Sequence, residues 1–319
     1  MATVATSSFQ KHRDGPPDKP PAPHTGKRRL SRQRAPWWFV LPALAFFAFV
    51  VLVPSAQGGW WAFTDWDGIS PVKHFVGLDQ FRTLWHDQAA RDAVGTTLLA
   101  ALSITIVQNA IGLLLALGVN AHLKSRNILR VLFFAPAVIT PVVTAYLWKY
   151  LYAPEGAINA LLKTVGLGFL RQDWLGDPDV ALWSVVAVVV WQFAGYSMVI
   201  FLAGLQSIPQ EIYEAAAVDG AGPVRRFWSV IRPMLAPAIT INLMLSIIGG
   251  LKLFDQVWVM TQGGPGGATD TLSTVIYKQA FQFNKYGYSI AMGLVLTLFV
   301  IVVSGLQYGY LSRQEKKNS

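Results

Sequence analysis

Long stretches without a charged side chain alternate with shorter polar segments along this chain, and their lengths predict its architecture. Six such stretches occupy residues 37–56, 93–121, 131–148, 180–210, 233–251 and 286–312. A bilayer core of about 30 Å needs about 20 apolar helical residues to cross it, and each stretch approaches or exceeds that length. Backbone groups inside lipid must pair with one another, so we expect an all-α polytopic membrane protein with six transmembrane helices.

Two of the six stretches depart from a simple span. The third contains Pro136 and Pro141, which predict a kink in the helix. The fifth continues to about residue 260 through Lys252 and Asp255, which are three positions apart and would share one helix face. These two charges either line a pathway through the membrane or form an ion pair near the outer end of the helix, and we favour the ion pair.

The first 36 residues are rich in proline and have almost no apolar periodicity, which is typical of a disordered tail. A basic cluster at residues 27–34 lies directly before the first stretch. A cleaved signal peptide is the alternative, but the segment is long, and its candidate cleavage site at residues 54–56 has a proline at an unfavourable place. We expect residues 1–36 to form a cytoplasmic tail.

Composition supports a membrane protein and excludes several kinds of site. Charged residues make up 13% of the 319 residues, about half the usual share of a soluble domain, and 53% of the residues are apolar. Cysteine is absent, which excludes disulfides, thiolate metal sites and a cysteine nucleophile. The five histidines are scattered without the spacing of metal ligands. We therefore expect no metal and no cofactor.

The distribution of lysine and arginine predicts how the chain is oriented in the membrane. With the N-terminus inside, the cytoplasmic segments hold more than twice as many basic residues as the external ones. This orientation, with both termini in the cytoplasm, explains the net charge of +9 without a nucleic-acid partner.

Sequence motifs for catalysis are missing. The chain contains no GxxxxGK[ST] phosphate loop, no HExxH and no GxSxG. The glycine-rich residues 263–267 follow a predicted helix and have no lysine after them, so they do not fit a phosphate loop. We expect a transport subunit that is not an enzyme. A self-sufficient secondary carrier is an alternative of another class, although neither a proton relay of intramembrane charges nor an inverted repeat is evident.

The segment between the fourth and fifth stretches predicts a short cytoplasmic helix, a turn and a second helix. Ser207 and Gln210 have the spacing of a capping box at the start of the first helix. Gly220 is placed to end this helix in a left-handed conformation, and Pro223 can begin the next one. The alanines at 215–217 leave a flank with little side-chain bulk, where a partner can approach the backbone. An amphipathic connector at the membrane interface is the alternative interpretation.

This segment, about residues 207–237, resembles the EAA loop of permease subunits of bacterial ABC importers. The matching residues are Glu214-Ala215-Ala216, Asp219-Gly220-Ala221, Phe227, Pro233 and Pro237. Arg232 takes the place of the leucine that usually precedes the first of the two prolines. The resemblance implies that the loop docks on a separate ATPase subunit, with the coupling role carried by Glu214, Ala215, Ala216, Asp219 and Gly220.

A second set of residues is similar to the carbohydrate-uptake branch of this family, and within it to the maltose-type first permease: Phe254-Asp255, residues 259–265, Tyr277 and residues 281–291. The resemblance covers about residues 93–312, which we take as the permease domain. The first helix with its external loop, residues 37–92, precedes this domain, and a cytoplasmic tail, residues 313–319, follows it.

The resemblance also implies where a sugar passes through the membrane. A sugar site needs an aromatic face and groups that bind hydroxyls. The expected substrate-pathway residues are Trp191, Gln192, Tyr196, Ser246, Gly250 and Leu253. Family members often carry asparagines where this chain has Gly250 and Leu253. Helix packing or interfacial anchoring is the alternative for the aromatic residues. Gln108 and Asn109 are expected to form hydrogen bonds between helices rather than to bind a ligand.

The expected function is therefore that of a sugar or oligosaccharide permease in an ATP-driven ABC importer of the bacterial cytoplasmic membrane. The expected partners are a second, different permease subunit, an ABC ATPase dimer, an extracytoplasmic solute-binding protein, the sugar and the lipid bilayer, but no nucleic acid. An ABC permease for a non-sugar solute such as glycerol phosphate is the alternative. An anionic solute favours converging basic residues, and the stretches themselves offer only Lys252.

Overall fold

The computed structural model describes residues 37–121 and 124–318, and all the named elements in these ranges are helical. The predicted tail at residues 1–36 lies outside the described residues. The chain divides into two compact units, Met1–Val50 and Val51–Ser319. The described part of the first unit contains a 3-10 helix, Trp37–Val40, then α1 (Leu41–Phe47) and the start of a π-helical turn, Ala48–Leu52.

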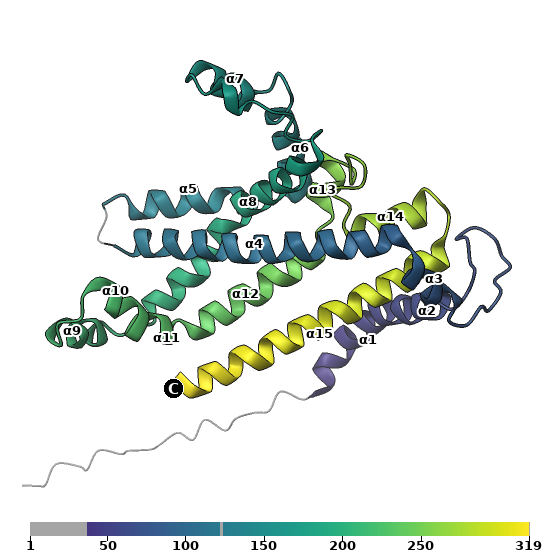
Figure 1. The fold of residues 1–319 in the computed structure, drawn as a ribbon. Helices are drawn as coiled ribbons and strands as arrows, with labels where there is room; N and C mark the ends of the chain where they lie inside the picture. The colour runs from purple at the N-terminus through teal and green to yellow at the C-terminus, as the bar shows by residue number, and fades with distance from the viewer. Residues whose placement is uncertain (1–36, 122–123, 319) are drawn as a thin grey trace, which may run out of the picture. The chain divides into compact units, whose positions relative to one another are not determined.

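The second unit contains the remaining α-helices, and Figure 1 shows their course. The helices up to residue 164 are α2 (Val53–Trp61), α3 (Asp79–His86), α4 (Gln88–Asn120), α5 (Arg126–Val138), α6 (Pro141–Leu151) and α7 (Ala157–Thr164). The later helices are α8 (Pro178–Gln206), α9 (Gln210–Val218), α10 (Pro223–Arg226), α11 (Arg232–Met234), α12 (Ala236–Leu251), α13 (Asp255–Met260), α14 (Leu272–Phe281) and α15 (Tyr286–Asn318). A 3-10 helix, Gly168–Leu170, and a π-helical turn, Phe227–Ile231, complete the order.

Four helical segments in the described residues are long and apolar enough to cross a membrane: Trp38–Trp61, α4, α8 and Tyr286–Arg313 of α15. Two bent helix pairs raise the number to six if each pair is one span. This is the helical, polytopic architecture that the sequence predicts, whereas the number of six spans stays a prediction. The last helix continues to Asn318, so residues 313–318 extend it rather than form a separate tail.

The third predicted span is broken rather than kinked. Pro136 lies inside α5, which ends at Val138, and α6 begins at Pro141. The two helices meet at an angle of 97°. Proline lacks the amide hydrogen that continues a helix, so the two prolines explain where the break falls.

The fifth predicted span is also interrupted, which contradicts the prediction of one helix through Lys252 and Asp255. α12 ends at Leu251, and α13 begins only at Asp255, so the two charged residues share no helix face. The interruption results from packing between helices that are distant in the sequence. Val257 and Met260 of α13 are buried in a cluster with residues of α6 and α8, and this packing separates α13 from the line of α12.

The long helices approach each other closely at small residues. α4, α8 and α12 lie side by side (Figure 1). A Cβ atom added to Gly112 of α4 would lie 2.6 Å from the Cβ atom of Ser197 on α8. A Cβ atom added to Gly250 of α12 would lie 2.6 Å from the Cα atom of Ala101 on α4. Small residues of this kind allow helix backbones to pack tightly inside a membrane, where apolar burial alone gives little drive.

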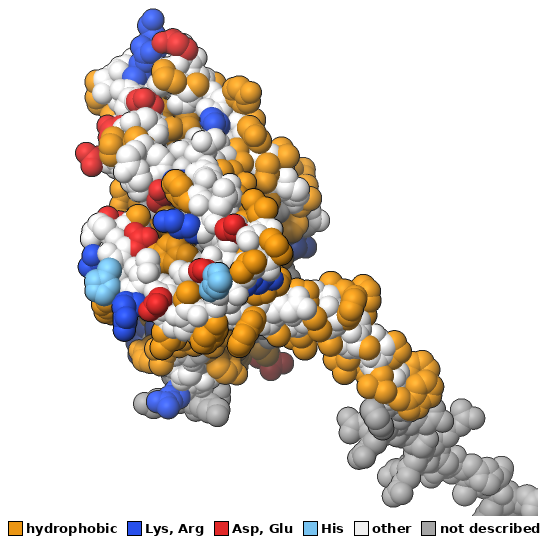
Figure 2. All heavy atoms as spheres, turned by 90° about the vertical axis from the view of Figure 1, so that its right-hand side faces the viewer, with side chains coloured by type: hydrophobic (Ala, Val, Ile, Leu, Met, Phe, Trp, Pro, Cys, Tyr) orange, Lys and Arg blue, Asp and Glu red, His pale blue; other side chains and the backbone are white. Residues whose placement is uncertain are grey.

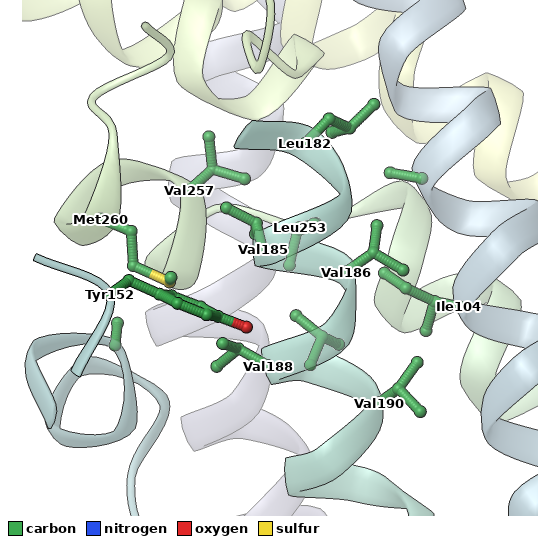
Figure 3. Close-up of a cluster of buried hydrophobic side chains, with 13 residues drawn as sticks. Ile104, Tyr152, Leu182, Val185, Val186, Val188, Val190, Leu253, Val257 and Met260 are labelled. Atoms are coloured by element: carbon green, nitrogen blue, oxygen red, sulfur yellow. The ribbon is translucent and has the colours of Figure 1, made fainter. Parts of the chain in front are cut away.

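Two buried clusters hold the ends of this bundle. One joins α6, α8 and α13, with Tyr152, Val188 and Val257 among its members (Figure 3). The other joins α4, α8 and α12 to the segment before and after α9, with Phe201 and Leu235 at its centre. α8 contributes to both clusters and is the central helix of the second unit.

Charged side chains gather near α3 and the start of α15, where Figure 2 shows acidic, basic and histidine side chains among apolar ones. A hollow of about 710 Å³ there is lined by Arg82, His86 and Lys285, among others. Asp87 accepts hydrogen bonds from the first amides of α4 and from the Tyr288 hydroxyl at 2.6 Å. This contact ties the start of α4 to α15.

Candidate coupling loop and substrate pathway

The loop predicted to contact an ATPase forms the expected helix, turn and second helix. α9 ends at Val218, and Gly220 follows with a φ of +69°. The Ala221 amide donates to the Ala216 carbonyl at 3.0 Å, and the Gly220 amide donates to the Ala217 carbonyl at 3.1 Å. This pair of hydrogen bonds is a Schellman motif, which favours glycine at the left-handed position. Pro223 begins α10, as the sequence predicts.

The predicted capping box at the start of α9 is wrong. α9 begins at Gln210, and Pro209, the residue before it, makes no side-chain capping bond. Ser207 belongs to the end of α8, where its hydroxyl donates to the Gly204 carbonyl at 2.8 Å. Because α8 runs to Gln206, the serine satisfies a carbonyl of the preceding helix instead of an amide of the next one.

Four of the five predicted coupling residues lie on the exposed side of this loop: Glu214, Ala215, Asp219 and Gly220. Ala216 instead points inward and is 7% exposed. Tyr213 and Phe227 pack against the cluster that holds the ends of α4, α8 and α12. Burial raises the pKa of the Tyr213 hydroxyl, and the nearby Arg226 guanidinium partly opposes this shift. One face of α9 is therefore anchored to the bundle, and the other is free for a partner.

The predicted pathway residues divide into two groups. Tyr196, Ser246, Gly250 and Leu253 line one cavity of about 450 Å³ between α4, α8, α12 and α13. Lys252 and Asp255 line the same cavity. Leu253 and Gly250 are themselves buried, so they shape the wall, whereas the Tyr196 side chain is 43% exposed and offers an aromatic face. The breaks after α5 and α12 both border this cavity, at Ala137 and Pro141 and at residues 252–256.

Trp191 and Gln192 lie outside that cavity. Trp191 lines a separate, largely apolar hollow with Phe133 and Trp183, and its ring meets Trp148 at a centroid distance of 5.3 Å. Gln192 is fully buried in the wall behind the cavity. The structure therefore brings Tyr196 of α8 together with the predicted α12 residues in one cavity. Trp191 and Gln192 of the same helix lie outside it.

Gln108 and Asn109 form the predicted hydrogen bonds between helices. The Gln108 amide nitrogen donates to the Ser197 hydroxyl of α8 at 2.9 Å, and the Asn109 amide nitrogen donates to the Ser246 hydroxyl of α12 at 2.8 Å. Gln108 also lines the cavity, so its side chain joins the packing of α4 on α8 to the cavity wall.

Sequence reasoning missed two buried polar residues near the cavity, Asn242 and Gln256. The Asn242 amide nitrogen donates to the Ser197 carbonyl at 3.0 Å, and the Gln256 amide nitrogen donates to the Gln192 side-chain oxygen at 3.0 Å. Asn242 is a single amide inside an apolar run, which is the signal that could have identified it, because such a group needs a partner inside a membrane. Gln256 follows Asp255 directly and had no such signal.

The favoured ion pair between Lys252 and Asp255 is absent among the described residues. A different pair lies nearby, since the Lys278 ammonium of α14 contacts the Asp270 carboxylate at 2.7 Å. Asp270 also accepts a hydrogen bond from Thr274, and Thr269 donates to the Gly264 carbonyl at 2.7 Å. These contacts hold the glycine-rich residues 263–267 as a compact turn between α13 and α14.

Comparison with known proteins agrees with this geometry. Residues 108–316 match the family described as binding-protein-dependent transport system inner membrane component. The chain is 34% identical over 271 residues to the multiple sugar-binding transport system permease protein MsmF of Streptococcus mutans, covering 85% of this chain and 93% of that one. It is 33% identical over 284 residues to the sn-glycerol-3-phosphate transport system permease protein UgpA of Yersinia enterocolitica, covering 88% and 94%.

A solved structure shows the same fold. The crystal structure of a bacterial ABC transporter involved in the import of the acidic polysaccharide alginate contains a chain that matches with a TM-score of 0.76 at 24% identity, over 86% of this chain and 94% of that one. The family match covers well over half of the chain, and the relatives cover most of it. The chain therefore belongs to the inner membrane components of binding-protein-dependent transport systems, the permease subunits of ABC importers.

Proposed function

We propose that this chain transports a neutral sugar or oligosaccharide through the bacterial cytoplasmic membrane, as one of two different permease subunits of an ABC importer. The observation that carries the proposal is the cavity at the two helix breaks. It combines the aromatic face of Tyr196 with the polar side chains of Asn242, Lys252 and Asp255. Aromatic rings pack against the apolar faces of sugars, and amides and hydroxyls bind sugar hydroxyl groups.

The charges of the cavity favour a neutral solute. Lys252 and Asp255 bring one positive and one negative group to its wall. An anion such as a phosphate ester is usually held by several converging basic groups, and a carboxylate in the wall opposes it. The likeness to MsmF supports a sugar. The likeness to UgpA keeps glycerol phosphate as the second candidate, which the lysine alone favours.

The proposal includes a separate ATPase dimer that binds α9, and a solute-binding protein that delivers the sugar from outside. Support for ATPase docking comes from the exposed Glu214, Ala215 and Asp219 beside the left-handed Gly220. Closure of the ATPases on ATP would move α9, and its anchored face would transmit the movement through Tyr213 and Phe227 to the bundle.

The test begins with the cognate solute-binding protein, which is sought among the genes adjacent to the one for this chain. Thermal-shift measurements with neutral mono- to tetrasaccharides and with sn-glycerol 3-phosphate identify which solute this protein binds. The complete importer in proteoliposomes should then accumulate a radiolabelled neutral saccharide only when ATP and the binding protein are present. Accumulation of glycerol phosphate but not of saccharides would overturn the sugar assignment, and accumulation without ATP would overturn the ABC mechanism.

A further inference from the structure

Two buried glutamines connect the helix breaks that border the cavity. The Gln192 amide nitrogen of α8 donates to the Ile139 carbonyl at 2.8 Å, in the break between α5 and α6. The Gln256 amide nitrogen, in the first turn of α13, donates to the Gln192 side-chain oxygen at 3.0 Å. Gln192 is fully buried and Gln256 is 4% exposed. One side chain of the central helix therefore holds both interrupted spans.

The direction of this hydrogen-bonded chain is fixed by its end. The Ile139 carbonyl can only accept, so Gln192 must present its amide nitrogen to Ile139 and its oxygen to Gln256. Gln256 must therefore donate. A side chain of similar size that cannot donate, such as methionine or leucine, leaves the buried Gln192 oxygen without a partner, which is costly in a medium without water.

The parts joined by this chain form the cavity wall. α13 packs on α6, and the Lys149 ammonium of α6 also donates to the Val259 carbonyl of α13 at 3.1 Å. The two short helices are thus held against each other. The loop from Lys252 to Phe254, between α12 and α13, carries further wall residues, and Pro141 at the start of α6 is another. The position of this wall depends on how α13 and the end of α5 are held against α8.

We propose that Gln192 and Gln256 act as positioning residues that set the width of the cavity by holding the two helix breaks against α8. Neither residue needs to touch the solute. The inference rests on the proposed function only in identifying this cavity as the site of transport. It assigns Gln192 to the wall rather than to solute contact, because both ends of its amide are already engaged.

The absence of cysteine from the chain allows a direct test in the assembled importer. Gly249 lines the cavity, and a Cβ atom added there meets nothing within 4 Å, so Gly249→Cys places a reporter thiol at the wall. Lys163→Cys on the exposed end of α7 provides a reference thiol outside it. The probe is the water-soluble cationic reagent methanethiosulfonate ethyltrimethylammonium, and the rate of labelling is measured at each thiol.

Gln256→Met and Gln256→Leu should each raise the labelling rate at Gly249→Cys about tenfold, because a broken chain frees α13 from α8. The rate at Lys163→Cys should not change. The double variant Gln192→Met/Gln256→Met should exceed Gln192→Met alone by little, since both substitutions break the same chain. Asn159→Leu removes another buried amide, which is not among the residues that line the cavity and is bonded to Pro154, Gln172 and Trp174, and is the matched control.

Unchanged labelling at Gly249→Cys in both Gln256 variants would overturn the positioning role. So would an equal rise at Lys163→Cys, or an equal rise at Gly249→Cys in Asn159→Leu, because either result indicates general loosening of the subunit. No sugar is used, so a failure of the sugar assignment leaves this result intact, and the two proposals fail separately.

Discussion

Gly220 combines a left-handed backbone with open surroundings, so we expect it to matter more for the proposed partner than for the fold that contains it. Its φ of +69° is a conformation that a branched side chain reaches only at a cost of about 1–2 kcal/mol. A Cβ atom at this position meets nothing within 4 Å, so the subunit itself has room for a larger side chain. Substitution therefore alters the end of α9 and the surface offered to a partner, without disturbing the bundle.

We expect Gly220→Val to insert in the membrane at normal levels but to recover less ATPase on affinity purification, and to lower uptake at matched expression. Gly222→Val is the control, because Gly222 has a φ of −60° and equally open surroundings. Equal ATPase recovery by the two variants would remove Gly220 from the coupling role.

Tyr196 and Trp191 lie five residues apart on α8 but in different surroundings. Tyr196 lines the cavity, whereas Trp191 lines the apolar hollow beside Phe133. Tyr196→Ala should raise the KM for uptake roughly tenfold, since a lost aromatic contact weakens binding by about that factor. Trp191→Ala should lower the thermal stability of the purified importer and leave KM unchanged. A raised KM for Trp191→Ala would place the solute on its side of α8 instead.

At the scale of elements, α4 and α8 depend on a close approach at Gly112. The position lies inside a long apolar helix, so the sequence identifies the span but not the side that meets α8. The distance of 2.6 Å from a Cβ atom at 112 to the Ser197 Cβ atom leaves no space for a side chain. This packing also aligns Gln108 with Ser197, one turn away on α4.

Gly112→Val should lower the stability of the subunit by about 1–3 kcal/mol, the usual cost of overfilling a packed core. Gly118→Val in the same helix is the control, because a Cβ atom there meets nothing within 4 Å. Thermal unfolding of the purified importer in detergent measures both. If Gly118→Val is as harmful as Gly112→Val, the loss reflects helix propensity rather than packing.

For the whole molecule, the orientation in the membrane is the prediction with the widest consequences. The excess of lysine and arginine in alternate segments places α9 and α10 in the cytoplasm. Reporter fusions after Arg126 and Arg225 should be active as cytoplasmic fusions, and those after Lys73 and Lys163 as external ones. A cytoplasmic result at Lys163 would contradict six spans with both ends inside.

Features that depend only on neighbouring residues could be predicted from the sequence. Long apolar runs predicted the helices, because each must satisfy its own backbone inside lipid. The Gly220 turn was also predictable, because its left-handed conformation is a local property. The prediction of a capping box from Ser207 and Gln210 was wrong, although their spacing suits one. α8 extends to Gln206, and the Ser207 hydroxyl therefore bonds to a carbonyl of α8.

The candidate pathway, in contrast, is built by contacts between helices that are distant in the sequence. Tyr196 and Ser246 face one cavity because α8 packs on α12, and no spacing along the chain contains that contact. The break between Lys252 and Asp255 has the same origin, since α13 leaves the line of α12 to bury Val257 against α6 and α8. A sequence pattern shows how apolar a segment is. The direction in which the chain turns after that segment depends on which apolar surfaces of other helices it packs against.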